Sequence, residues 1–316
     1  MKYLVDKMLK KPKIVVIGDL MVDKYVYGSV ERISPEAPVP ILEKEEEEQF
    51  LGGAGLVATN LCTLGAEVDF ISVVGEDEGA NNAFSLLERD NLSSKYILRD
   101  KKRKTITKKR FIATSPYFQM LLRLDHESRD LLDRETESKI LANVRLAIST
   151  ANLVVVSDYN KGLMTKAIID ETISCARSRK IKIIVDTKKS VYEYKGSDIF
   201  VPNYKELCIA LGLKPSNEDD IIIPNATKLS KMLGAILVVK RSGRGATIVD
   251  GKPPKTYPTL AHDIVNVSGA GDIFVAIVAN SLCLGKNLNE AVELANKGCA
   301  KAISRRHPSV TLEDLK

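Results

Sequence analysis

The sequence contains few of the residues that zinc sites and thiol redox motifs require. Its three histidines, His126, His262 and His307, are far apart, and none has a second ligand at metal spacing. The five cysteines show no CxxC spacing and lie mostly in apolar, helix-like surroundings: Cys62, Cys175, Cys208, Cys283 and Cys299. We therefore expect surface or capping histidines, reduced thiols and a cytoplasmic protein.

Three signatures of common enzyme classes are also missing. Residues 245–253 (GATIVDGKP) have the wrong spacing for a GxxxxGK[ST] loop, and Pro253 stands at the hydroxyl position. The first predicted strand is followed by GDLMVD rather than GxGxxG, and no GxSxG occurs. These absences argue against a P-loop enzyme, a classical nicotinamide dehydrogenase and a serine hydrolase.

The sequence has neither a long apolar run nor a strong excess of charge. No run reaches the roughly 18 apolar residues of a membrane span, and the lysine-rich residues 2–13 lead into a strand rather than a signal-peptide core. We therefore expect neither export nor membrane insertion. The 47 basic and 41 acidic residues give a charge of +6, too small and dispersed to indicate nucleic acid but compatible with a phosphorylated substrate. The composition is that of an ordinary globular protein with a large core.

The first strong structural signal is residues 13–23 (KIVVIGDLMVD), whose β-branched apolar run predicts a buried central strand. Asp19 and Asp23 stand at its predicted carboxyl end, where open α/β sheets gather their ligands. They are candidates for binding sugar hydroxyls, or else ordinary turn-forming residues.

Two segments predict a small β element outside the main sheet. Residues 24–50 alternate like exposed strands around ERISPEAPVP, whose three prolines forbid a long helix. Residues 101–125 are basic and read as a hairpin, which we pair with residues 24–50 as one lid. Its lysines suit a phosphate ligand or are simply solvated. Glu45–Glu48 form a charged edge that discourages further strand pairing.

The rest of the chain alternates helices with β-branched runs. Gly52 and Gly53 precede a helix that ends at Leu64, and they permit close approach of a ligand or are merely structural. Beyond residue 129 the alternation continues to the C-terminus. We therefore expect an α/β fold with a mostly parallel sheet covered on both faces, forming one domain over residues 1–316 with the lid.

Residues 266–282 (NVSGAGDIFVAIVANSL) contain the most informative junction, a glycine-rich loop that leads through Asp272 into an apolar helix. Gly269 and Gly271 let backbone N–H groups and the positive helix end face an anion. Asp272 could then accept a proton from a hydroxyl held beside that anion, or be an ordinary helix cap. An anion cradle next to a carboxylate suits phosphoryl transfer from ATP to an alcohol.

Several stretches together resemble the ribokinase-like PfkB family of sugar kinases, with matching order and spacing over nearly the whole chain. They are residues 18–23 (GDLMVD), 52–55 (GGAG) with 64–66 (LGA), 202–206 (PNYKE) and 267–272 (VSGAGD). Within the family, four further stretches are most similar to the D-glycero-β-D-manno-heptose-7-phosphate kinases of ADP-heptose and lipopolysaccharide synthesis: residues 32–40 (RISPEAPVP), 105–108 (TITK), 121–125 (LLRLD) and 157–162 (SDYNKG). No HxGH-type nucleotidyltransferase motif follows, so the resemblance is to the kinase unit alone.

The resemblance implies a ribokinase-like three-layer fold and a role for each matching residue. Asp272 matches the catalytic base, with Gly269, Ala270 and Gly271 as the anion hole for the transferring γ-phosphate of ATP. The sugar-hydroxyl positions are Asp19, Asp23, Gly52, Gly53 and Asn60. The positions for the phosphorylated substrate and the nucleotide phosphates are Lys108, Arg110, Arg123, Asp158 and Lys161. The nucleotide positions are Lys188, Asn203, Glu206, Ser242, Gly243, Gly245 and Asn296, and Glu206 would hold Mg²⁺ through water.

Departures from the family pattern bear on the substrate, and one of them is the C-terminal stretch KAISRRHPSVT, which lacks the usual Gly-Thr ending. Leu56 replaces an asparagine that is expected at the sugar, and an apolar side chain cannot bind a hydroxyl. Thr187 stands in place of a usual proline, while Lys240 and Ile273 stand in place of usual threonines. The residues expected for catalysis are intact, so we expect an active kinase.

The resemblance thus implies an ATP- and Mg²⁺-dependent kinase that phosphorylates the anomeric hydroxyl of a heptose 7-phosphate, and a homodimer formed through the lid. The alternatives are a kinase for another sugar or sugar phosphate, which Leu56 favours, and a non-catalytic nucleotide- or sugar-binding protein. We expect no nucleic-acid or membrane partner.

Overall fold

A nine-stranded sheet organises the computed structural model, which describes residues 11–316; the lysine-rich residues 2–10 considered above lie outside it. Its strands, in spatial order, are β13 (Lys255–Tyr257), β12 (Ala246–Val249), β11 (Ile236–Lys240), β10 (Ile199–Phe200), β9 (Lys182–Thr187), β8 (Leu153–Asp158), β1 (Lys13–Gly18), β4 (Glu67–Val74) and β5 (Ile97–Arg99). Neighbours from β11 to β5 pair in parallel, whereas β12 and β13 close one edge as antiparallel strands. The predicted mostly parallel sheet is confirmed.

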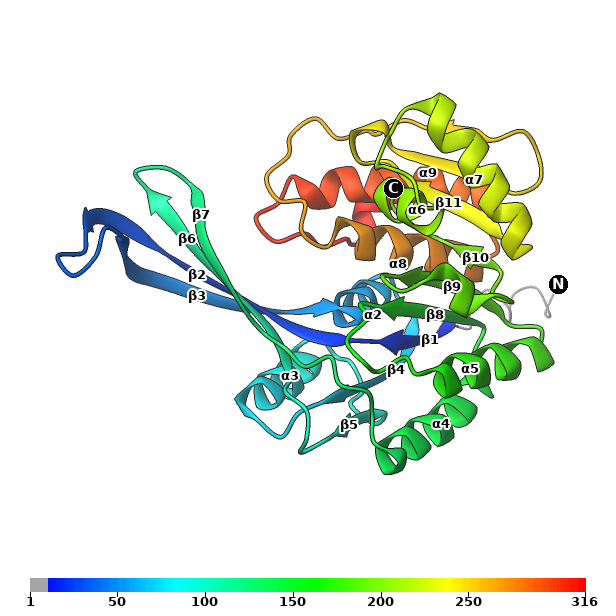
Figure 1. Cartoon of the computed structure of the whole chain (residues 1–316), viewed down its shortest axis with the longest axis horizontal. Helices are drawn as coiled ribbons and strands as arrows, with labels where there is room; N and C mark the ends of the chain where they lie inside the picture. The colour runs from blue at the N-terminus through cyan, green and yellow to red at the C-terminus, as the bar shows by residue number, and fades with distance from the viewer. Residues whose placement is uncertain (1–10) are drawn as a thin grey trace.

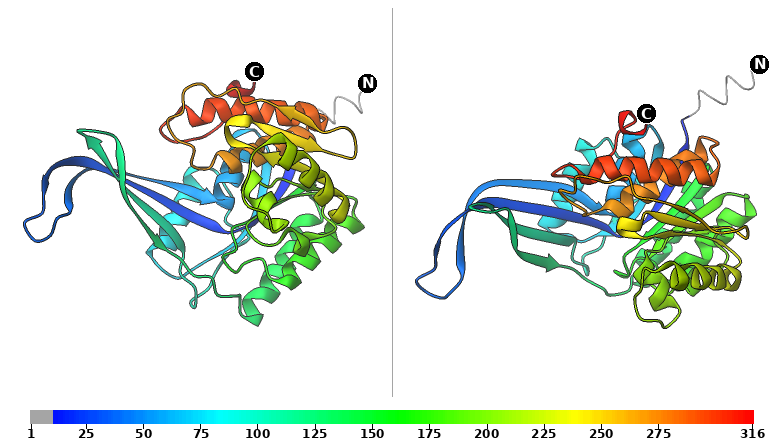
Figure 2. Two further views of the ribbon diagram at one scale, coloured as in Figure 1. Left: turned by 45° about the horizontal axis from the view of Figure 1, so that its top comes forward. Right: turned by 90° about the horizontal axis from the view of Figure 1, so that it is seen from above.

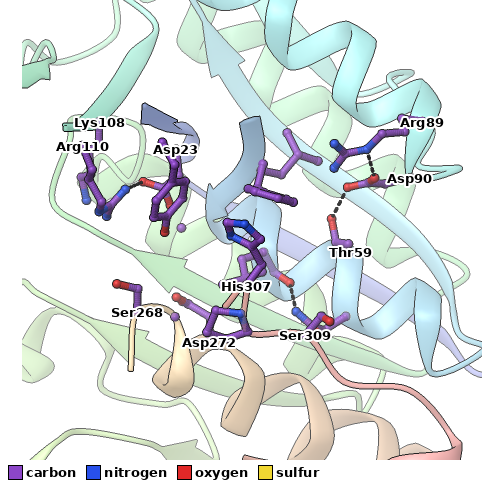
Figure 3. Close-up of a pocket in the computed structure, with 18 of the residues that line it drawn as sticks. Asp23, Thr59, Arg89, Asp90, Lys108, Arg110, Ser268, Asp272, His307 and Ser309 are labelled. Atoms are coloured by element: carbon purple, nitrogen blue, oxygen red, sulfur yellow. Dashed lines mark hydrogen bonds and ion pairs between the residues drawn. The ribbon is translucent and has the colours of Figure 1, made fainter. Parts of the chain in front are cut away.

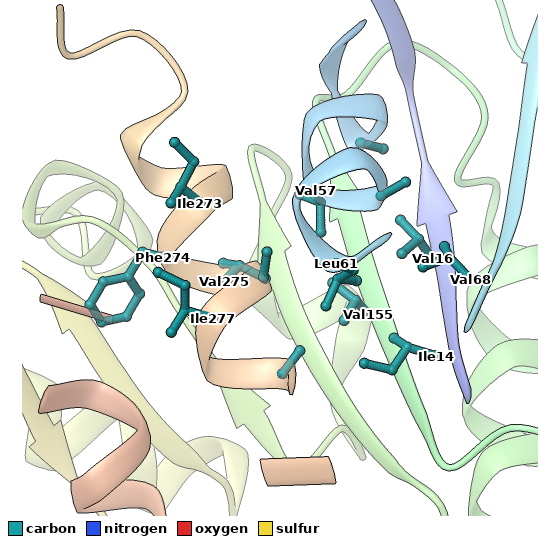
Figure 4. Packing of buried hydrophobic residues seen from close by; sticks show 14 of the residues in the cluster. Ile14, Val16, Val57, Leu61, Val68, Val155, Ile273, Phe274, Val275 and Ile277 are labelled. Atoms are coloured by element: carbon teal, nitrogen blue, oxygen red, sulfur yellow. The ribbon is translucent and has the colours of Figure 1, made fainter. Parts of the chain in front are cut away.

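Helices cover both faces of this sheet, because successive side chains of each buried strand point to opposite sides (Figures 1 and 2). In β1, Ile14 and Val16 belong to one apolar cluster, and Val15 and Ile17 to the other. The first cluster packs under α2 (Ala54–Thr63), α3 (Glu78–Arg89), α8 (Ala270–Cys283) and α9 (Leu288–Ile303) (Figure 4). The second packs under α4 (Arg134–Ile148), α5 (Lys166–Ser178), α6 (Tyr204–Ala210) and α7 (Asp219–Leu233).

A second sheet of four strands extends away from this body (Figures 1 and 2), and we call it the arm. Its order is β3 (Pro40–Gly53), β2 (Leu20–Ile33), β6 (Ile106–Ser115) and β7 (Gln119–His126). β2 pairs antiparallel with β3 and parallel with β6, so segments about 85 residues apart in sequence lie side by side. The two predicted lid segments therefore form one sheet.

The structure corrects the boundaries of two predicted elements. The central strand expected over residues 13–23 ends at Gly18, and Leu20 already begins an arm strand, so Asp23 lies in the arm. Gly18 lies against the Ser157 carbonyl at this point, where an added Cβ would be 1.9 Å from that oxygen. The basic strand expected from residue 101 begins only at Ile106, because residues 101–103 form a turn.

Across residues 11–316, no helix combines the length and the apolar character needed to cross a bilayer.

Candidate active site

The N-terminus of α8 forms one wall of the candidate site. Gly269 caps the helix with a φ of +75°, a conformation that favours glycine, and Asp272 lies in the first turn. The first N–H groups of a helix have no intrahelical acceptor, and together with the helix dipole they favour an anion. The Lys240 amine also reaches this loop, 3.2 Å from where a Cβ on Gly271 would lie. The cradle therefore has a cation beside it.

The Asp272 carboxylate is buried beside the cradle. Burial raises the pKa of Asp272 to about 7, and the negative charge of Asp186 adds to the rise. A hydrogen bond from Tyr159 and the charges of Lys240 and Lys188 act in the opposite direction. A carboxyl group with a pKa near neutrality can exchange a proton with a ligand hydroxyl at physiological pH.

A cavity of about 390 Å³ opens beside Asp272 on the side of the arm, and we call it the arm-side cavity. Figure 3 shows Lys108, Arg110 and Asp23 at one end, and Arg89, Asp90 and Thr59 at the other. Arg110 pairs with Asp23 at 2.7 Å. Burial lowers the pKa of Lys108. The cavity therefore offers two adjacent cations and a carboxylate to a polar ligand.

The C-terminal segment completes the wall of this cavity with His307, Pro308 and Ser309 (Figure 3). His307 stacks against Phe50 at 4.2 Å between ring centroids and contacts Glu48. Arg306 lies 3.7 Å from the centre of the Tyr27 ring and pairs with Glu46 at 2.7 Å. The C-terminal segment is thus bound to the base of the arm.

A larger cavity of about 800 Å³ lies on the other side of Asp272, and we call it the helix-side cavity. Its lining includes most of the residues predicted for the nucleotide: Lys188, Asn203, Ser242, Gly243, Gly245 and Asn296. Asn296 is held by its amide, which donates to the carbonyls of Tyr257 at 3.0 Å and Pro258 at 3.3 Å. Lys240 and Asp186 also line the cavity.

The two cavities meet at three residues, Tyr159, Gly269 and Asp272, which line both. Two ligands bound there would approach each other at a buried carboxylate and a helix N-terminus. This arrangement suits the transfer of an anionic group from one ligand to the other.

Tyr159 is a site residue that the sequence analysis missed. Its hydroxyl donates to both carboxylate oxygens of Asp272 at 2.8 Å. The amines of Lys108 and Lys188 lie 5.4 Å and 5.6 Å from the centre of its ring. The sequence feature that could have identified Tyr159 is its position next to Asp158 in the SDYNKG stretch.

Of the predicted substrate residues, Asp23, Gly53, Asn60, Lys108 and Arg110 line the arm-side cavity. Gly52 lies behind Asp23, because a Cβ there would be 2.3 Å from a carboxylate oxygen of Asp23. The Asn60 amide is already engaged: it donates to the Leu56 carbonyl at 2.8 Å and accepts from the Val310 N–H at 2.9 Å.

Four other predicted substrate residues line neither cavity. Asp19 and Asp158 are buried and accept hydrogen bonds from the backbone of residues 159–161. Lys161 pairs with Glu127 at 2.5 Å. Arg123 lies on the arm strand β7 and pairs with Asp125 at 2.8 Å. Their predicted roles toward the substrate therefore stay predictions, and the contacts that the structure shows for them are with the protein itself.

Glu206 also stands back from the helix-side cavity lining. It forms a capping box at the start of α6, in which its carboxylate accepts the Asn203 N–H at 2.8 Å, and it pairs with Lys188. Among the described residues, no three His, Cys, Asp or Glu side chains are grouped closely enough to hold a metal ion.

Asp186 was not predicted, yet it provides the clearest observation in favour of a cation. One of its carboxylate oxygens pairs with Lys240 at 2.5 Å. The other is buried and has no hydrogen-bond partner within residues 11–316, although the Lys188 amine lies 3.8 Å from it. A buried carboxylate oxygen that accepts no hydrogen bond, on a side chain that lines a cavity suited to phosphates, fits a hydrated Mg²⁺, which keeps most of its waters.

Leu56 lies against the cradle. A Cβ on Gly269 would be only 2.2 Å from Cδ2 of Leu56, and Leu56 lines the arm-side cavity. The cavity wall next to Gly269 is therefore apolar, as the departure from the family pattern predicts.

Known protein families include one whose sequence pattern this chain matches. Residues 11–315 match the model of the pfkB family of carbohydrate kinases. The bifunctional protein HldE of Aliarcobacter butzleri is 38% identical over 306 residues, which are 96% of this chain and 63% of that protein. The HldE of Azorhizobium caulinodans is also 38% identical, over 92% of this chain and 61% of its own length. The chain thus spans less than two thirds of these relatives.

Two solved structures share the fold. Phosphofructokinase-2 from Escherichia coli in complex with potassium superimposes with a TM-score of 0.79 at 19% identity, covering 97% of each chain. A ribokinase from Arabidopsis thaliana complexed with ribose and ATP gives a TM-score of 0.73 at 19% identity, covering 97% of this chain and 99% of that one. The fold is ribokinase-like, and the match of the family model over residues 11–315 shows that the chain belongs to the pfkB family of carbohydrate kinases.

Proposed function

We propose that this carbohydrate kinase uses ATP to phosphorylate the C1 hydroxyl of D-glycero-β-D-manno-heptose 7-phosphate, giving the 1,7-bisphosphate. The observation that carries the proposal is the meeting of the two cavities at Asp272. The sugar phosphate would occupy the arm-side cavity and ATP the helix-side cavity. The choice of sugar is supported by the two HldE relatives and by the RISPEAPVP, TITK, LLRLD and SDYNKG stretches.

The chemistry follows from the groups around Asp272. The C1 hydroxyl gives its proton to the Asp272 carboxylate while its oxygen attacks the γ-phosphorus of ATP. The bond from that phosphorus to the β–γ bridging oxygen breaks, and ADP leaves. Backbone N–H groups of residues 269–271 and the Lys240 amine would stabilise the charge on the transferring phosphoryl group.

The arm would hold the far end of the substrate. Lys108 and Arg110 are neighbours on one face of β6 and line the arm-side cavity, so they are suited to the 7-phosphate. Asp23 and the polar groups near Thr59 would accept hydrogen bonds from sugar hydroxyls. Closure of the arm would exclude water from the reacting phosphoryl group.

On the nucleotide side, Asp186, Asn203 and Glu206 would hold Mg²⁺, Glu206 through water. When bound, the ion neutralises phosphate charge. The wall formed by Ser242, Gly243, Gly245 and Asn296 would take the nucleotide base.

We also propose that the arm joins two copies of the chain. Met120, Leu122 and Leu124 alternate along the edge strand β7 and are each more than half exposed, and such an exposed apolar edge strand is suited to contact with a second copy. The relatives are bifunctional by name, and this chain corresponds to part of their length, so we propose that it is the kinase unit of ADP-heptose synthesis in the cytoplasm.

A kinase for another sugar or sugar phosphate is the second candidate. The apolar Leu56 at the cavity wall favours it, because a site that reads a hydroxyl there would need a polar group. A non-catalytic binding protein is disfavoured by the intact Asp272.

The test is ADP release with Mg·ATP over a panel of the heptose 7-phosphate, sedoheptulose 7-phosphate, fructose phosphates, ribose and adenosine. Turnover of the heptose phosphate, lost in Asp272→Asn, is the expected result. Turnover confined to another sugar would replace the substrate and keep the mechanism. ATP binding without turnover on any sugar would instead support a binding protein.

A further inference from the structure

The loop of residues 158–161 is fixed by two buried carboxylates, those of Asp19 and Asp158, which line neither cavity. One Asp19 oxygen accepts the N–H of Tyr159 at 2.8 Å and that of Lys161 at 3.3 Å. Asp158 accepts the N–H of Asn160 at 2.7 Å, and Asn160 adopts a φ of +58°. The second oxygen of Asp158 accepts from the Tyr194 hydroxyl at 2.6 Å. The loop therefore has a single well-supported conformation.

This fixed loop places the Tyr159 hydroxyl against Asp272. The hydroxyl is 2.8 Å from both carboxylate oxygens, and Tyr159 lines both cavities. Asp272 begins a helix far away in sequence, so its side chain gains this support only through the folded loop. We propose that Tyr159 is a positioning residue for Asp272: it fixes the rotamer of the carboxylate and stabilises its ionised form until a ligand hydroxyl arrives.

The surrounding charges make this contribution measurable. Asp186 at the end of β9 repels a charge on Asp272, whereas Lys188 after β9 and Lys240 on β11 attract it. Three further groups lie around Asp272 and Tyr159. The Lys108 amine of β6 lies over the Tyr159 ring, and Asp23 of β2 lines the arm-side cavity with them. The neutral Cys299 thiol of α9 contacts the Ala270 carbonyl. Burial of Asp272 favours its protonated form, so removing a donated hydrogen bond should move its titration to higher pH.

The direct test is a ¹³C NMR titration of the chain labelled at the aspartate carboxyl carbon, with Asp272 assigned by loss of its resonance in Asp272→Asn. Tyr159→Phe should raise the midpoint of Asp272 by about one pH unit, the size expected for one hydrogen bond to a charged group. Tyr257→Phe is the matched control, because it also removes a tyrosine hydroxyl that donates to a side-chain oxygen, that of Asn289, but it neither contacts Asp272 nor anchors the loop 158–161. An unchanged Asp272 midpoint in folded Tyr159→Phe would overturn the proposal.

A second variant covers the case in which Tyr159→Phe does not fold. Asp19→Asn weakens the anchor of the Tyr159 backbone and should move the Asp272 midpoint in the same direction by a smaller amount. An unchanged midpoint in that variant would then count against the proposal.

The kinetic consequence rests on the proposed function. The acid limb of the pH profile of kcat/KM should move up with the NMR midpoint in Tyr159→Phe, and kcat should fall more than KM changes. If Asp272→Asn kept full activity, the proposed base would be wrong while the NMR shift could still support the inference. The NMR titration therefore tests the positioning role of Tyr159, the kinetics test Asp272 as the base, and either proposal can be contradicted without the other.

Discussion

Among single residues, Asp272 gives the sharpest test of the proposed reaction. Asp272→Asn keeps the size of the side chain and its hydrogen bond from Tyr159 but removes the base. We expect kcat to fall by about 10²- to 10⁴-fold with little change in ATP affinity. Steady-state kinetics and calorimetric ATP binding measure the two quantities. Equal loss of ATP binding would assign Asp272 to the nucleotide instead.

The raised pKa of Asp272 also affects stability. The unfolded group has a pKa near 3.8 and the folded group near 7, so between these values the folded protein binds more protons. The contribution of Asp272 to the free energy of unfolding should therefore decrease as pH rises from about 4 to about 7, by at most about 1.4 kcal/mol per unit, and stay constant above.

Denaturant unfolding of the wild type and Asp272→Asn at pH 5 and pH 8 measures this effect. The variant should gain stability relative to the wild type at the higher pH. A difference that is the same at both pH values would mean that Asp272 is already ionised at pH 5.

Gly269 combines a positive φ with contact to Leu56. A side chain at this position would therefore lower stability in two ways, through the backbone conformation and through overlap with Leu56, and the two effects can be measured separately. Gly269→Ala should destabilise the protein by about 2 kcal/mol or more, from the backbone conformation and from the overlap with Leu56. In the double variant with Leu56→Ala, only the backbone cost should remain at position 269. A double-mutant cycle with no coupling would show that Leu56 moves aside freely.

At the level of elements, the C-terminal segment links α9 to the base of the arm. Arg306→Ala removes the contact with Tyr27 and the pairs with Glu46 and Glu48. Because His307 to Ser309 line the arm-side cavity, we expect the KM for the sugar to rise a few-fold while the KM for ATP stays unchanged. Arg145→Ala is the control, since Arg145 forms a surface pair with Glu171 on the far helices. Parallel changes in both KM values would contradict this role.

The exposed apolar face of β7 provides the test of assembly. Leu122→Glu should convert a dimer to a monomer in sedimentation without loss of fold, because a charge cannot be buried in the apolar contact. Leu146→Glu changes an equally exposed leucine on α4 and should leave the mass unchanged. A wild-type monomer at micromolar concentration would remove the proposed dimer.

Taken over the whole molecule, the strongly periodic parts of the sequence were predictable. The apolar alternation of residues 14–17 predicts a central strand, and the glycines before Asp272 predict the start of α8. The two segments that form the arm were also apparent, since their strand patterns are local.

What could not be predicted depends on contacts between distant segments. Asp19 and Asp158 have the right residue type and position for ligands, but tertiary folding turns their carboxylates toward the loop 158–161. Tyr159 gains a role only because β8 lies close to α8 in space. A strand pattern also cannot show that the chain leaves the central sheet at Asp19.

The two edges of the arm have a consequence for how far assembly can proceed. The β3 edge carries Glu43 and Glu45 to Glu48, whereas the β7 edge carries exposed leucines. A strand that docks along β3 would face this run of negative charge, but β7 can meet the β7 of a second copy about a two-fold axis. Such a contact would use the same surface on both copies and would leave only the charged β3 edges exposed. In a dimer of the proposed kind, the negative charge along β3 would therefore oppose growth into a continuous β-ribbon.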